Sequence, residues 1–208
     1  MENGKDQKTD LGWSYYRWGP LVFQTTVDKK DITKIKKLCK KDKVKDYKTN
    51  LAGIIEEEFE IDKEKYLAIL QPYMIKYASA HKQWYDENIH TVGIVSAWVN
   101  FMKEMESNPN HVHAECNLSS VLYTSVPAAL KKENSKYVGA LKGGGPGAIT
   151  ILHGEYKPFS INNYRIFPEE GMLLIFPFNL YHSVAPFKTK CERISVAANF
   201  VVDAKVYK

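Results

Sequence analysis

Two histidines separated by one residue, His111 and His113, carry the clearest chemical signal in the sequence. On an extended backbone, side chains two residues apart point to the same side, so both imidazoles can reach one metal ion. Glu115 continues the same spacing and adds a carboxylate to that side. An isolated pair of this kind is more often a pair of exposed loop histidines. The pair therefore indicates a metal centre only in combination with further ligands.

A third histidine, His182, follows the apolar run GMLLIFPF at 171–178. The next apolar run opens with Arg193, which is costly to bury unless its guanidinium meets an anion. Arg193 and Ser195 lie two residues apart and face the same way on a strand, so a guanidinium fork and a hydroxyl can hold one carboxylate. The alternative is a salt bridge between Arg193 and an internal Asp or Glu.

In their order along the chain, these residues resemble the motif of the iron(II)- and 2-oxoglutarate-dependent oxygenases. That motif is H-x-D/E, a long gap, a distal histidine, and then R-x-S on the next strand. The chain is most similar to small oxygenases of marine phages and their hosts, over about residues 90–202. The stretches that carry the resemblance are AWVN (97–100), NPNHVHAECNLSSVLYTSVP (108–127), EEGMLLIFPFNLYHSVAPF (169–187) and ERISVAANF (192–200).

The resemblance implies Fe(II) and 2-oxoglutarate as cofactors and dioxygen as a co-substrate. It implies no catalytic side chain beyond the metal ligands. Oxidative decarboxylation of 2-oxoglutarate would release succinate and CO₂ while an unidentified substrate is hydroxylated. Arg193 and Ser195 would hold the far carboxylate of 2-oxoglutarate, and Tyr123 resembles a tyrosine that assists them. For Tyr123, simple packing inside the barrel is the competing interpretation.

The sequence departs from the family pattern at the carboxylate ligand, because His113 stands where Asp is usual. Two ligand sets follow. One consists of His111, His113 and His182, and the other of His113, Glu115 and His182. The three-histidine set is the closer match to this branch of the family. Asn100 and Trp98, on the stretch before the motif, are candidates to line the pocket.

Two other functions compete with a 2-oxoglutarate-dependent hydroxylase. One is a jelly-roll binding module without catalysis, and the other is a three-histidine, cupin-like dioxygenase that uses no keto acid. Arg193 and Ser195 argue against the second, since such an enzyme needs no carboxylate clamp. The substrate would be a protein side chain or a small molecule. Nucleic acid is less favoured, because the lysine-rich segment 29–48 contains no arginine.

The pattern of apolar residues predicts an α+β chain. A helix is expected with Asp31 as its cap, and a longer one from Asp62 to about Tyr85, with Pro72 as an obstacle. Short strands then follow, and turn signals such as Ser107–Asn110 and Asn162-Asn163 separate them. This order fits a β-sandwich or barrel packed by helices. The resemblance makes it a double-stranded β-helix, of the jelly-roll or cupin type. The expected strands span 91–101, 118–126, 148–154, 159–161, 171–178 and 193–202.

The 208 residues fit one domain. We expect an aromatic N-terminal strap over 1–20, which also offers a contact for a homodimer. A single oxygenase domain would cover 21–208, with helical support over 28–90 and a barrel core over about 91–202. The chain has no apolar run of membrane-spanning length, and its three cysteines are too few and too far apart for a disulfide framework. These features predict a cytoplasmic protein, in the host cytoplasm if a phage encodes it.

Overall fold

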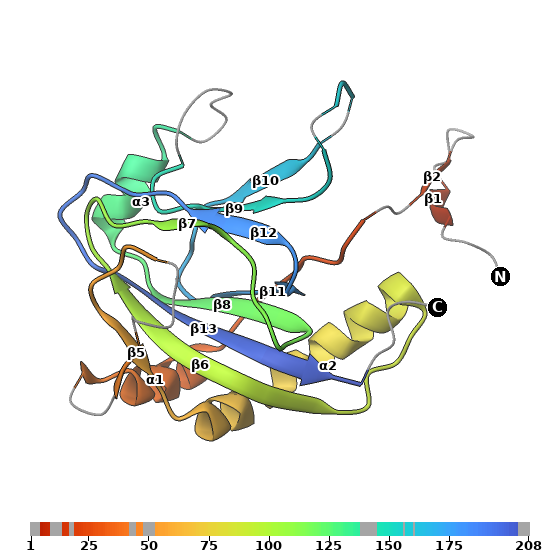
Figure 1. Ribbon diagram of the computed structural model, residues 1–208, viewed down its shortest axis with the longest axis horizontal. Coiled ribbons are helices and arrows are strands. Elements are labelled where there is room, and N and C mark those ends of the chain that lie inside the picture. The colour runs from red at the N-terminus through yellow and green to blue at the C-terminus, as the bar shows by residue number, and fades with distance from the viewer. Residues whose placement is uncertain are drawn as a thin grey trace.

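A computed structural model describes residues 5–8, 14–16, 19–41, 45–47, 53–137, 145–155, 157–159 and 161–203. The described part of the chain forms three helices and thirteen strands, which Figure 1 shows. In chain order the elements are β1 (Lys5–Lys8), β2 (Ser14–Tyr16), β3 (Phe23–Thr26), α1 (Lys29–Leu38), β4 (Lys45–Asp46), β5 (Glu58–Glu60), α2 (Lys63–Tyr85), β6 (Val92–Met102), β7 (Asn108–His111), β8 (Leu118–Ser125), α3 (Ala128–Asn134), β9 (Ile149–Leu152), β10 (Asn163–Ile166), β11 (Met172–Pro177), β12 (Tyr181–Val184) and β13 (Arg193–Val202).

Two antiparallel sheets face each other. The large sheet has the strand order β3-β11-β8-β13-β6-β5-β4, and the small sheet has the order β10-β9-β12-β7. In both sheets, strands that are neighbours in space are often distant in sequence, as in the pairing of β13 with β6 and of β12 with β7. This arrangement is the predicted double-stranded β-helix. Strands β1 and β2 form a separate two-stranded sheet.

The apolar core has two layers, one on each face of the large sheet. The first layer joins α1 and α2 to the outer face, where Ile35, Tyr66 and Leu70 pack against Val99 and Val196. In Figure 1, α1 lies at the lower left of the large sheet and α2 passes behind its strands. The second layer fills the space between the two sheets. The helices therefore back the large sheet, and its inner face stays free to line a site.

The long helix α2 confirms the prediction for 62–85. The Asp62 side chain accepts a hydrogen bond from the Lys65 backbone N–H at 3.0 Å, and Asp86 ends the helix with a φ of 57°. Pro72 lies inside α2 on an exposed surface and does not split it. Packing of the buried face of α2 therefore outweighs the lost backbone hydrogen bond at this proline.

The predicted cap of the first helix is wrong. α1 follows Asp28, and Asp31 lies in its first turn. The Asp31 carboxylate accepts hydrogen bonds from the Tyr73 hydroxyl at 3.0 Å and from Lys34 Nζ at 2.8 Å. Asp31 is thus a buried link between α1 and α2, a role that its local sequence does not reveal.

Five of the six predicted strands appear within one or two residues of their predicted bounds, as β6, β8, β9, β11 and β13. The strand expected at 159–161 is wrong, because the described residues of that stretch are not in a strand. β10 lies instead at Asn163–Ile166, starting within a predicted turn and pairing with β9. β7 likewise occupies the predicted turn around Pro109 and pairs with β12. Pairing between strands overrides these turn signals.

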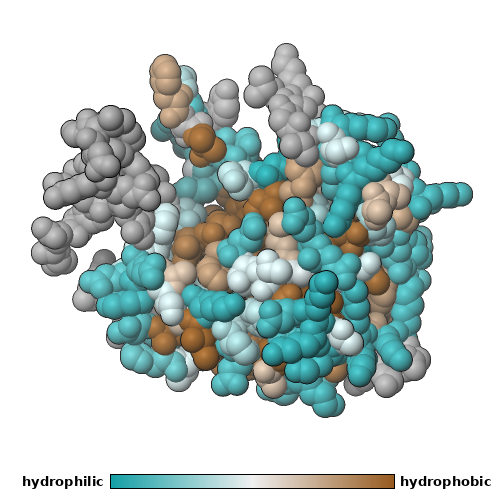
Figure 2. Space-filling model, turned by 180° about the vertical axis from the view of Figure 1, so that it is seen from behind, coloured by the Kyte–Doolittle hydropathy of each residue, from teal (hydrophilic) through white to brown (hydrophobic). Residues whose placement is uncertain are grey.

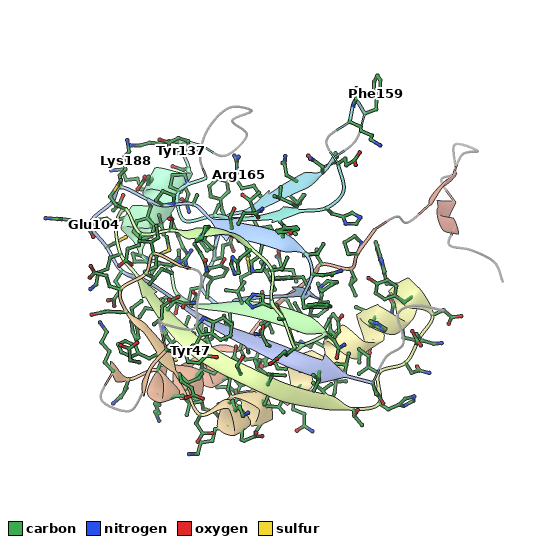
Figure 3. The ribbon with its side chains drawn as sticks, in the orientation of Figure 1. Tyr47, Glu104, Tyr137, Phe159, Arg165 and Lys188 are labelled. Atoms are coloured by element: carbon green, nitrogen blue, oxygen red, sulfur yellow. The ribbon has the colours of Figure 1, made fainter. Side chains whose placement is uncertain are left out.

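Strands β9 and β10 form a hairpin that projects from the body. Phe159 and Ile161 lie between the two strands and are fully or almost fully exposed. Figure 3 shows Phe159 pointing away from the rest of the molecule, and Figure 2 shows the projecting hairpin with apolar atoms towards its tip. The hairpin contributes its base, Ile149 and Ile151, to the core between the sheets.

The predicted strap at the N-terminus is not tested. Trp13 and Trp18 lie outside the described residues, and the strap and its dimer contact stay predictions. Among the described helices, none has both the length and the apolar character that a bilayer crossing requires.

Candidate metal centre and cosubstrate pocket

Three histidines meet on the inner side of the small sheet. His111 ends β7 and His182 lies on β12, directly opposite it in the antiparallel register. His113 follows β7, and its backbone N–H donates a hydrogen bond to the Phe178 carbonyl at 3.0 Å. Their ligand atoms all lie within 4.8 Å of one another. The structure therefore brings together the histidines of the three-histidine set.

Backbone carbonyls fix the orientation of two of the rings. Nδ1 of His111 lies 2.8 Å from the Pro109 carbonyl oxygen, and Nδ1 of His182 lies 2.8 Å from that of Leu180. Each Nδ1–H can donate there, which leaves the Nε2 lone pair of each ring free. A hydrogen bond from the ring nitrogen that does not bind the metal orients a histidine ligand in this way.

The nitrogen atoms converge at a spacing that fits a metal ion. Nε2 of His113 and Nε2 of His182 are 3.3 Å apart. Two nitrogens about 2.1 Å from one ion, at right angles, would be about 3.0 Å apart. The tilted rings of His111 and His182 have centroids 4.2 Å apart. This cluster matches the donor set expected of a first-row transition metal.

Burial keeps the imidazoles in the form that binds metals. Desolvation, reinforced by the neighbouring His111, lowers the pKa of His113 to about 4 and that of His182 to about 3. Both rings are therefore neutral at physiological pH, with a lone pair available for coordination. Trp98 packs on His113 with ring centroids 5.9 Å apart, and Phe176 contacts His182 edge-on at 4.9 Å.

Glu115 does not join this cluster. It is exposed, its backbone has a φ of 58°, and it is absent from the group of converging ligand atoms. Within the described residues, no carboxylate oxygen completes the cluster. The geometry favours the set of His111, His113 and His182 over the set that contains Glu115.

A narrow cavity of about 50 Å³ connects the histidines with the start of β13. Arg193, Ser195 and Tyr123 line it, together with Asn100 and the three histidines. Ser195 lies opposite Tyr123 in the pairing of β13 with β8, so their side chains share the inner face. The predicted metal ligands and the predicted 2-oxoglutarate ligands thus border one space.

Arg193 is buried without a carboxylate partner. Its Nη1 donates a hydrogen bond to the Gly147 carbonyl at 2.8 Å, and its guanidinium lies 5.3 Å from the centre of the Tyr123 ring. Its Nε and the Tyr123 hydroxyl have no hydrogen-bond partner among the described residues. The alternative interpretation, a salt bridge to an internal Asp or Glu, finds no such pair in the part of the chain that is described. Two buried polar groups directed at one cavity fit an anionic ligand such as a carboxylate.

Several cavity residues carried no signal in the sequence. Asn108 lies in a stretch that reads as a turn, although its side chain borders the cavity. Ile149 is an apolar residue of an expected strand, and Val184 lies outside the expected strands, so neither stood out. Only the register of the small sheet shows that these side chains face the metal cluster.

The sequence matches a known protein family. The family described as "Putative 2OG-Fe(II) oxygenase" matches residues 96–199, which is half of the chain. The matched segment contains all three clustered histidines, Tyr123, Arg193 and Ser195. The chain belongs to this family of 2-oxoglutarate- and iron(II)-dependent oxygenases, whose cofactors are Fe(II) and 2-oxoglutarate and whose co-substrate is dioxygen.

Solved structures share the fold. A prolyl hydroxylase from Trichoplax adhaerens, in complex with a hypoxia inducible factor peptide fragment, aligns with a TM-score of 0.57 and 12% identity over 88% of this chain and 83% of that one. A Pseudomonas putida prolyl-4-hydroxylase gives 0.54 and 14%, over 86% and 92% of the two chains.

A viral collagen prolyl hydroxylase from Paramecium Bursaria Chlorella virus-1, solved with 2-oxoglutarate, gives a TM-score of 0.54 and 11% identity over 86% and 94%. At these identities the likeness concerns the fold. No protein with a curated function matches the sequence.

Proposed function

We propose that the protein is a hydroxylase that uses Fe(II) and 2-oxoglutarate, with His111, His113 and His182 as the iron ligands. The observation that carries the proposal is the shared cavity, in which three converging imidazoles face a buried arginine that has no carboxylate partner among the described residues. The prolyl hydroxylases among the structural neighbours support hydroxylation as the type of reaction.

The residues of the chain have separate tasks in this proposal. Arg193 holds the far carboxylate of 2-oxoglutarate through its guanidinium, and the Tyr123 and Ser195 hydroxyls are close enough in the sheet to share that carboxylate. The apolar residues between the sheets exclude water from the cavity. Iron held by the three histidines would supply the activation of dioxygen and of 2-oxoglutarate, with succinate and CO₂ as the products beside the hydroxylated substrate.

The three-histidine site carries no negative charge of its own. With two histidines and one carboxylate, the protein would contribute one negative charge to the iron. With three neutral histidines, the anionic cosubstrate provides the charge balance. We therefore infer that 2-oxoglutarate and the metal bind with strong mutual cooperativity at this site.

Anaerobic titration of Fe(II) and 2-oxoglutarate tests the proposal, with the weak visible charge-transfer band of the iron–keto acid complex as the readout. We expect the band in the wild type and in Glu115→Ala, and its loss in His113→Ala. Arg193→Lys keeps the positive charge but loses the two parallel hydrogen-bond donors of the guanidinium. At least about ten times more 2-oxoglutarate should then be needed to form the band. Arg165→Lys, at an exposed arginine, is the matched control.

Each other outcome points elsewhere. Loss of the band in Glu115→Ala would support the ligand set of His113, Glu115 and His182. Metal binding without any band in the wild type would contradict the keto acid mechanism. In that case, stabilisation of the folded protein by metal alone would favour the cupin-like dioxygenase. Binding of ligands without any turnover would favour the binding module.

A further inference from the structure

A buried carboxylate lies beside the cavity and has no part in the proposed iron and 2-oxoglutarate sites. Glu58, on β5, is 1% exposed, and neither of its carboxylate oxygens has a hydrogen-bond partner among the described residues. Buried carboxylates in proteins are normally paired with a cation or with several donors. Glu58 is therefore a strong acceptor with unused capacity.

The register of the large sheet directs Glu58 to the inner face. Glu58 pairs with Asn100 on β6, Asn100 pairs with Ser195 on β13, and Ser195 pairs with Tyr123 on β8. Directly paired residues share one face of a sheet, and the last three line the cavity. Phe59, the next residue on β5, belongs to the layer between the large sheet and the helices. Glu58 thus continues this row of inner-face residues by one strand, directly beside Asn100, which lines the cavity.

A second unpartnered acceptor lies next to Glu58. Asn100 is buried, and its Oδ1 has no hydrogen-bond partner among the described residues. Cross-strand neighbours of this kind have Cβ atoms about 5 Å apart. A carboxylate and an amide oxygen at this spacing can be satisfied together by one group that carries several N–H donors.

The local charge favours a cation. Burial, reinforced by the Glu106 carboxylate, raises the pKa of Glu58 to about 7, and among the described residues no cation acts on Glu58. The groups that act on Arg193 are Tyr123 and Cys191, so Arg193 does not neutralise Glu58. The cavity is therefore lined by a cation at Arg193, while the Glu58 carboxyl lies behind Asn100 with no cation beside it among the described residues.

We propose that Glu58 and Asn100 bind an ammonium or guanidinium group of the substrate, so that the enzyme selects substrates with a cationic nitrogen. This inference rests on the proposed function, since the substrate must reach the iron while 2-oxoglutarate is bound. Asn100 is two residues from Trp98, which packs on His113. Two residues along a strand span about 7 Å, which is comparable to an extended lysine or arginine side chain.

The test uses the anaerobic Fe(II)–2-oxoglutarate complex and four probes. Nα-acetyl-lysine amide and Nα-acetyl-arginine amide carry the charge, while the corresponding norleucine and citrulline compounds are their neutral counterparts. Calorimetry gives the affinities. We expect at least one charged probe to bind the wild type about tenfold or more tightly than its neutral counterpart. Glu58→Gln should abolish that preference, whereas Glu60→Gln, at an exposed residue of the same strand, should keep it.

Equal binding of charged and neutral probes, no binding of any probe, or an unchanged preference in Glu58→Gln would each overturn the inference. The charge-transfer band serves as the internal control. If the band persists in Glu58→Gln, the fold and the cofactor sites are intact. A change in probe affinity then reports on the substrate site alone. Asn100→Leu provides an independent second variant, and it should weaken the preference if the pair acts together. Absence of the band in the wild type would instead remove the proposed function itself.

Discussion

The buried carboxyl of Glu58 makes the free energy of unfolding depend on pH. Glu58 has a pKa of about 7 in the folded protein, against an ordinary value of 4.5. Between these values the unfolded chain releases a proton that the folded protein keeps. The free energy of unfolding therefore decreases as pH rises through this window and levels off above pH 7. Glu106 is the charged neighbour that reinforces the effect of burial.

Replacing Glu58 by Gln removes this pH-dependent cost. At about 1.4 kcal/mol per pKa unit, we expect Glu58→Gln to unfold with a free energy about 3 kcal/mol higher than the wild type at pH 8. At pH 5 the difference should be less than about 1 kcal/mol. Urea denaturation of the cofactor-free protein at both pH values measures it. Glu60→Gln should change the stability by less than about 0.5 kcal/mol, and equal stability of Glu58→Gln and wild type at pH 8 would show that Glu58 is already paired.

Residue type and order along the chain, together with the family resemblance, pointed to residues that the structure brings together. His111, His113 and His182 converge, and Arg193 shares a cavity with Ser195 and Tyr123. Glu58 could not be found in the same way. Glu56, Glu58 and Glu60 alternate along one extended stretch, and only the pairing of β5 with β6 selects one of them for burial.

At the level of elements, predictions succeeded where apolar periodicity was long. The runs at β6, β8, β11 and β13 are long enough to identify themselves as buried strands. β7 and β10 consist of polar and turn-forming residues, and they become strands only because β12 and β9 offer backbone partners. Strand pairing between distant segments is a property that local sequence does not encode.

The proline in α2 allows a test of how strongly tertiary packing stabilises this helix. Pro72 is exposed, lies inside the helix and removes one backbone hydrogen bond. We expect Pro72→Ala to raise the free energy of unfolding by about 1–2 kcal/mol, since Ala restores the donor at little cost. Chemical denaturation measures the gain, with Gln71→Ala as a neighbouring exposed control. A loss of stability would contradict this expectation and would mean that α2 needs Pro72 to fit the large sheet.

At the level of the whole molecule, the two sheets carry different parts of the site. The small sheet holds His111 and His182, whereas the large sheet holds Arg193, Ser195 and Tyr123. A ligand that reaches both the metal and Arg193 would link the two sheets. Binding of such a ligand should therefore stabilise regions that are far apart in the sequence.

Hydrogen exchange can follow this link directly. With Mn(II) alone, we expect slower amide exchange in β7 and β12, because these strands carry the histidines. Addition of 2-oxoglutarate should extend the protection to β13 and β8. Arg193→Lys should keep the first effect and reduce the second at equal ligand concentration. Protection of β13 by the metal alone would contradict the division of tasks between the sheets.

The direct pairing of His111 with His182 has a consequence for folding. Successive residues of a strand point to opposite faces, so a slip of one residue between β7 and β12 would turn an imidazole away from the interior. Strands β8 to β11 lie between these two strands in the chain, so the pair can form only after distant segments have met. The amount of metal bound per protein molecule would therefore report the fraction of molecules whose small sheet has its native register. Circular dichroism of the same sample does not distinguish that register from a slipped one.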